Sequence, residues 1–226
     1  MKKRLVFFIL LSLTNYCFSQ KSSNNSITAG NYEEHLMHYF ENKNDDIIHE
    51  TINIYQNSNY RHMLDTLDQL LIFFFYGIKI DNTDRYNNFL EIINNSRVNR
   101  LINIFEIIEN NNISEYLDKA ETSPDLNDVY WALFFSSGNT NYLDRLFHII
   151  MDNLNETENP IYYIAMRTAL WSIASNMEIF PQKKEHTQRT NILSEDVKQY
   201  LFNNNYIQID NDTREFVGIQ RQKGRW

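Results

Sequence analysis

Two histidines near the start of the chain have the spacing of a metal site. His35 and His38 are three residues apart in a segment with a helical pattern, and Glu34 and Glu41 stand beside them. Imidazoles at this spacing share one helix face and can bind a common metal ion, with carboxylates completing the coordination. The chain has no His-Glu-x-x-His motif, so a zinc protease is not indicated. A metal-dependent enzyme built on His35 and His38 is therefore one hypothesis.

Three large aromatic residues, Trp131, Phe135 and Trp171, could form a binding surface for a peptide. Large aromatic side chains supply contact area at a small cost in entropy. Their helical spacing is also typical of a core, and both interpretations remain open. Nothing indicates a catalytic serine, since the chain lacks the G-x-S-x-G turn. We assign no catalytic residue and expect no cofactor.

The amino terminus has the three-part pattern of a secretory signal peptide. Residues 2–4 are basic, residues 5–13 are apolar, and small residues precede Gln20, which places the signal peptide at residues 1–19. The apolar run is too short to span a bilayer. Cys17 suggests an acylated lipoprotein, but the Asn-Tyr pair before it does not fit that signal. We expect export to the periplasm or the extracellular space.

The charge balance limits the partners that the chain can have. Without residues 1–19 it carries 18 basic and 29 acidic side chains, a net charge of −11. This sign disfavours phosphate backbones and anionic lipid head groups, so we expect no nucleic-acid partner and no stable membrane insertion. It favours a soluble surface or a basic protein partner.

Apolar residues recur with the helical period through most of the chain, and short loops separate the periodic segments. This pattern predicts an all-α fold: an irregular stack of antiparallel helical hairpins, either solenoid-like or a bundle. The expected helices cover Tyr32–Lys43, Asp46–Gln56, Tyr60–Ile78, Thr83–Asn94, 98–108, 124–137, a segment from about Thr140, 161–177 and 195–202.

The expected domain organisation is simple. A flexible polar leader covers residues 20–31, a single helical domain covers 32–205, and a tail covers 206–226. Two short apolar segments in the tail, 206–209 and 215–219, could pair as a small β-hairpin.

Residues typical of helix ends locate two of the helices. Ser123 is placed to cap a helix that starts at Pro124, and Gly138 suits the left-handed residue that follows its end. Ser96 is the expected cap of the helix over 98–108. The helix over 161–177 is apolar nearly all round, which predicts a buried central element. An ion pair between Asp128 and Arg167 would link it to the helix over 124–137.

Two tryptophan-centred blocks resemble a group of uncharacterised bacterial helical proteins. The first reads Asp-Val-Tyr-Trp-Ala-Leu-Phe-Phe-Ser-Ser-Gly over 128–138, where the group has approximately D-x-x-W-x-x-F-F-A-T-G. The second reads Thr-Ala-Leu-Trp-Ser-Ile-Ala-Ser-Asn over 168–176, where the group has A-A-x-W-S-L-A-S-N. The match extends over about residues 80–182. The resemblance implies a helical fold, and it assigns neither an activity nor functional residues.

Taken together, these features favour an exported helical protein that binds a protein partner in the bacterial envelope, without enzymatic activity. Two alternatives remain open: a metal-dependent envelope enzyme using His35 and His38, and a structural factor in envelope assembly.

Overall fold

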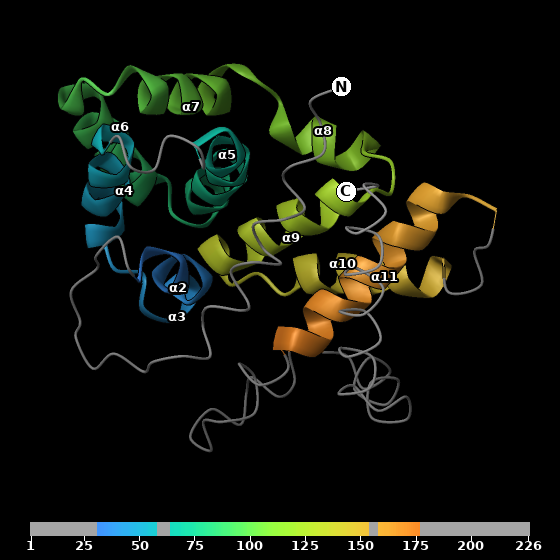
Figure 1. Ribbon diagram of the computed structural model, residues 1–226. Coiled ribbons are helices and arrows are strands. Elements are labelled where there is room, and N and C mark those ends of the chain that lie inside the picture. Colours follow the sequence, from blue (N-terminus) through green and yellow to red (C-terminus); the bar gives the residue numbers. More distant parts are fainter. Residues whose placement is uncertain (1–30, 58–63, 154–157, 177–226) are drawn as a thin grey trace. The chain divides into compact units, whose positions relative to one another are not determined.

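The computed structural model describes residues 31–57, 64–153 and 158–176, and it confirms the all-α prediction. In these ranges the chain forms ten helices and no strand (Figure 1). The helices are α2 (Tyr32–Met37), α3 (Tyr39–Asn42), α4 (Asp46–Gln56), α5 (Leu64–Asp81), α6 (Thr83–Ser96), α7 (Asn99–Asn110), α8 (Ile113–Lys119), α9 (Pro124–Ser137), α10 (Asn141–Asp152) and α11 (Pro160–Asn176).

The described residues fall into two compact units. The first, the α2–α8 unit, holds α2 to α8 together with Trp131–Asn139. The second, the α10–α11 unit, holds Glu121–Tyr130, α10 and α11. Helix α9 thus gives its first half to one unit and its second half to the other. The predicted single domain over 32–205 extends beyond the described ranges and stays a prediction.

Helix α5 organises the core of the α2–α8 unit. It packs against α6 and α7, while α4 packs against both of them (Figure 1). The Phe75 ring lies 4.9 Å from Phe105 and 6.2 Å from Phe89, and Tyr86 stacks on Phe105 at 5.4 Å. All four side chains are buried. The apolar run over 70–78 therefore supplies a core helix.

The α10–α11 unit is built on the contact between its two longest helices. The apolar face of α10 is buried, and α11 brings Ala165 and Ala169, each 0% exposed. Small side chains at these positions let a neighbouring helix approach closely. The prediction that α11 is buried nearly all round was wrong for its first turn, because Ile161 is 55% exposed. Burial begins at Ala165, where the small residues start.

The predicted bounds and caps of α9 are confirmed. The Leu126 amide donates to the Ser123 hydroxyl oxygen at 3.3 Å, and Pro124 is the first helical residue. Gly138 has a φ of +76°, the left-handed conformation expected just after the helix.

Other helix ends differ from the expectations. The predicted helix over 32–43 breaks at His38 into α2 and α3. Ser96 is the last residue of α6, and Val98 occupies the cap position of α7. The Ser96 hydroxyl nonetheless accepts a hydrogen bond from the Val98 amide at 3.2 Å. Helix α8 was missed, because seven residues are too few to establish a period.

Several predictions lie outside the described residues: the signal peptide, the leader, the helix over 195–202 and the hairpin in the tail. Within the described ranges, no helix combines the length and the apolar character that crossing a bilayer requires.

Candidate functional site

The two histidines of the predicted metal site lie on either side of the end of α2. His35 is in its last turn, and His38 separates α2 from α3. The His38 Nδ1 atom lies 3.4 Å from the Glu41 carboxylate. Burial lowers the pKa of His35, and Glu34 offsets part of that effect. Among the described residues, no three His, Cys, Asp or Glu side chains are grouped to hold a metal, so the metal site stays a prediction.

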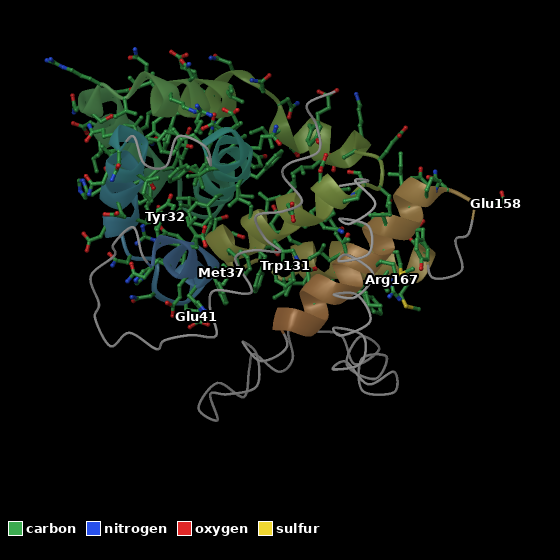
Figure 2. The ribbon with its side chains drawn as sticks, viewed as in Figure 1. Tyr32, Met37, Glu41, Trp131, Glu158 and Arg167 are labelled. Atoms are coloured by element: carbon green, nitrogen blue, oxygen red, sulfur yellow. The ribbon has the colours of Figure 1, made fainter. Side chains whose placement is uncertain are left out.

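Two of the three aromatic residues predicted to bind a ligand lie in the core. Trp131, labelled in Figure 2, is 1% exposed, and Phe135 is 4% exposed. Their rings stack at 5.2 Å. A ligand could reach them only by displacing core packing. The side chain of Trp171 lies outside the described part, although its backbone belongs to α11. A binding role for the three residues stays a prediction.

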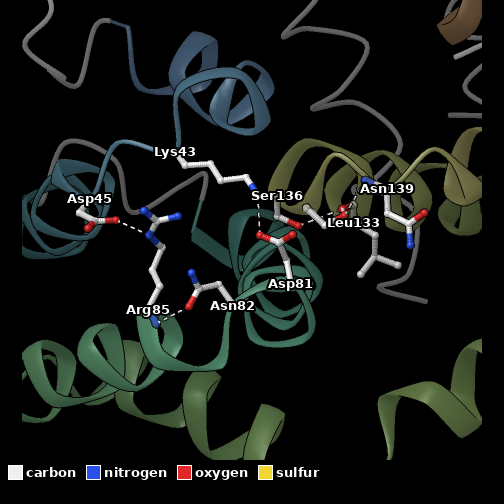
Figure 3. A network of polar contacts seen from close by, with 9 residues as sticks. Lys43, Asp45, Asp81, Asn82, Arg85, Leu133, Ser136 and Asn139 are labelled. Carbon is white, nitrogen blue, oxygen red and sulfur yellow. Dashed lines mark hydrogen bonds and ion pairs between the residues drawn. The ribbon is translucent and has the colours of Figure 1, made fainter. Parts of the chain in front are cut away.

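Ion pairs connect helices of the α2–α8 unit that are distant in sequence (Figure 3). The Lys43 ammonium group binds the Asp81 carboxylate at 2.5 Å, and the Arg85 Nε atom binds Asp45 at 2.7 Å. The Asn82 side chain caps α6 by accepting from the Arg85 amide at 2.9 Å. These contacts tie the segment between α3 and α4 to the junction of α5 and α6.

A second polar cluster centres on Asp68 of α5. Its carboxylate accepts from the Arg100 Nε atom at 2.8 and 3.0 Å and from the Tyr55 hydroxyl at 2.7 Å. Arg100 also reaches Asp65 at 2.6 Å. Burial, reinforced by the hydrogen bond to Asp68, raises the pKa of Tyr55, so this phenol stays neutral and acts as a donor. The cluster joins α4, α5 and α7.

The α2–α8 unit contains more carboxylates than cations. Its described residues include 15 Asp and Glu but only 6 Lys and Arg. Five of those six cations, all except Arg97, are bound to a carboxylate of the unit. Because its carboxylates outnumber its cations, the described part of the unit carries a net negative charge.

The α10–α11 unit contains a buried polar contact between helices. The Asn127 amide group donates to the Ala165 carbonyl at 2.9 Å and to the Thr168 hydroxyl at 2.8 Å. The Thr168 hydroxyl in turn donates to the Ala165 carbonyl at 3.0 Å. Asn127 is 2% exposed, so these bonds fix the position of α11 against the first half of α9.

The predicted ion pair between Asp128 and Arg167 was wrong. No contact joins them within ion-pair distance, and both the Asp128 Oδ2 and the Arg167 Nε atoms are buried without a hydrogen-bond partner. Burial raises the pKa of Asp128 well above its usual range, and the charge of Asp125 raises it further. Since a buried carboxylate without a cation is costly, the folded chain holds a proton on Asp128 more tightly than the unfolded chain does.

The ion-paired residues were not predicted as a group. Asp68 and Arg100 are 32 positions apart, and Lys43 and Asp81 are 38 apart. No local motif signals such pairs, since any of several carboxylates in the sequence could serve each cation.

No protein-family model, curated protein or solved structure matches the chain. The resemblance of residues 128–138 and 168–176 to uncharacterised bacterial helical proteins stays an expectation.

Proposed function

We propose that this chain is an exported protein-binding module of the bacterial envelope and that its acidic surface takes a basic protein partner. One observation supports the proposal most directly. In the described part of the α2–α8 unit, five of six cations are bound to carboxylates while 15 acidic residues are present. A surface with this imbalance attracts a positively charged partner and repels nucleic acid.

Several carboxylates are available to such a partner. Asp46 in α4, Asp84 and Glu91 in α6, and Glu106 in α7 are exposed, and none of them forms an ion pair with another described residue of the unit. They come from three helices that pack against one another. Charges spread over a rigid helical surface steer a partner into place more than they add to its final affinity.

Affinity capture tests the proposal. The chain from residue 20 to 226 is immobilised and exposed to envelope extract of its own organism at low and high salt, and each bound protein is then purified and titrated. We expect one basic partner, with an affinity that falls on the order of tenfold as salt screens the acidic surface. A complex that is insensitive to salt would contradict the proposal.

A pair of variants separates net charge from local structure. Glu91→Gln with Glu106→Gln removes two exposed charges and should weaken the complex. Asp45→Asn with Arg85→Gln removes an ion pair without changing the net charge, and it should leave the affinity unchanged. Equal effects of the two variants would show that the acidic excess is not what the partner recognises.

A further inference from the structure

Three large apolar side chains in the described part of the α2–α8 unit are exposed. Ile80 at the end of α5 is 48% exposed, Ile107 in α7 is 41% exposed, and Tyr116 in α8 is 55% exposed. Single exposed apolar residues are common on protein surfaces. Ile80 and Tyr116 are of interest because helical spacing and a ring contact place them along one edge of α5.

Helix α5 supplies the middle of this edge. Phe73, Tyr76 and Ile80 follow one another at intervals of three and four residues, so they lie on one face of the helix. Phe73 and Tyr76 are half-buried. The Phe73 ring lies 6.0 Å from the Tyr116 ring, which sets α8 beside the start of this face.

An ion pair sets the end of α7 beside the other end of the same face. The Lys79 ammonium group lies 2.9 Å from the Glu109 carboxylate. Lys79 precedes Ile80 directly, and Glu109 belongs to the last turn of α7. We call the four apolar residues along this edge the apolar strip: Phe73, Tyr76, Ile80 and Tyr116.

The unit that carries the apolar strip is negative overall, with 15 Asp and Glu and 6 Lys and Arg among its described residues. Beside the strip, Asp81 and Glu115 are paired with Lys43 and Lys119. The excess charge therefore comes from the other carboxylates of the unit. An apolar surface on a negatively charged unit complements a segment that carries large apolar side chains beside Lys or Arg.

We propose that the apolar strip docks an amphipathic helix of the protein partner, with Lys or Arg on both sides of its apolar stripe. This inference rests on the proposed function and names the recognition element. From Phe73 to Ile80 the strip is about 10 Å long, which matches two turns of a bound helix. A helix of that kind presents anchors at i, i+4 and i+7, the usual spacing of helices bound in apolar surfaces.

A synthetic peptide tests the strip directly. The probe is an 18-residue helix with Leu at the anchor positions and Lys on both flanks, and a second peptide carries Glu in place of every Lys. Binding of each fluorescently labelled peptide to the chain over residues 20–226 is measured by anisotropy. The Lys peptide should bind, and the Glu peptide should bind at least about tenfold more weakly, since like charges would face each other.

Two double variants locate the binding. Ile80→Ser with Tyr116→Ser alters the apolar strip at exposed positions, so the fold should be retained; circular dichroism verifies this. The double variant should lower the affinity for the Lys peptide at least about tenfold, as expected for the loss of two anchors. The matched control, Met151→Ser with Ile161→Ser, alters two similarly exposed apolar residues of the other unit and should bind as the wild type does.

The outcomes separate this inference from the proposed function. If the strip variant captures the partner as well as the wild type does, the strip is not the docking site, and the proposed function still stands. Loss of peptide binding in the strip variant, with no partner captured from the envelope, would support the strip and overturn the proposed function. If the wild-type chain binds neither peptide, the inference is overturned. It is also overturned if the wild type forms a dimer that the strip variant abolishes, because the strip would then bind a second copy of the chain.

Discussion

Gly77 of α5 faces Ser136 of α9 so closely that no side chain fits between them. A Cβ atom at Gly77 would lie 1.9 Å from the Ser136 hydroxyl oxygen and 3.1 Å from its Cβ atom. Ser136 is fully buried and donates to the Leu133 carbonyl at 3.0 Å. The contact joins two segments of the α2–α8 unit that are separated by more than fifty residues of sequence.

Gly77→Ala should therefore destabilise the protein. In an open helix the same change stabilises by roughly 0.5–1 kcal/mol, because alanine has the higher helix propensity. Here the steric conflict opposes that gain, and overpacking of a filled core costs about 1–3 kcal/mol. Urea denaturation of wild type and variant measures the difference in the free energy of unfolding.

A second substitution identifies the cause. Ser136→Gly removes the two nearest atoms that the new methyl group would meet and leaves the Leu133 carbonyl oxygen at 3.3 Å, so Gly77→Ala should cost much less in that background. A double-mutant cycle in which the two changes simply add would show that the two residues do not interact.

Asp128→Asn should stabilise the protein at neutral pH and reduce the pH dependence of its stability. Burial raises the pKa of Asp128 in the folded chain above its value in the unfolded chain. The folded chain then holds the proton more tightly, so the free energy of unfolding falls as pH rises from about 4 towards the raised pKa. Asparagine resembles the protonated acid and is insensitive to pH.

The measurement is thermal denaturation from pH 4 to pH 8. Asp152→Asn, at an exposed position of the same unit, serves as the control. The explanation fails if the wild type and Asp128→Asn change in parallel with pH.

Arg100→Ala should cost about 1–2 kcal/mol, because it removes charge-assisted hydrogen bonds to a partly buried carboxylate. Arg100→Lys should restore little, since an ammonium group lacks the planar fork with which Arg100 reaches both Asp65 and Asp68. Lys119→Ala, which breaks an exposed pair with Glu115, should change stability by less than about 0.5 kcal/mol. Chemical denaturation compares the three, and equal losses for Arg100→Ala and Lys119→Ala would refute this ranking.

Gly138→Ala should destabilise by about 1 kcal/mol, because Gly138 has a φ of +76° and alanine is strained in the left-handed region. Space is not the obstacle, since a Cβ atom there would lie 3.5 Å from Phe40 in ordinary contact. Gly138→Asn should cost less, because asparagine tolerates this conformation. Thermal unfolding of both variants distinguishes strain from crowding: a larger loss for the bulkier asparagine would indicate crowding.

The sequence alone determined the helical class and most helix positions. Apolar residues at the helical period placed α4, α6 and α9 within two residues of their ends, because the period depends only on local geometry. Local chemistry also located the ends of α9, since a serine cap and a left-handed glycine act on their own neighbours in the chain. The break at His38 lacked such a signal.

Only the tertiary structure decided which charged residues meet. Several carboxylates in the sequence could serve Arg100 or Arg85, and their pairing depends on how α4, α5, α6 and α7 pack. The expected pair of Asp128 and Arg167 was wrong for the same reason, since being on two neighbouring helices does not fix the rotation of either one. The close approach of Gly77 to Ser136 could not be predicted either, because a contact between distant segments produces no periodic pattern in the sequence.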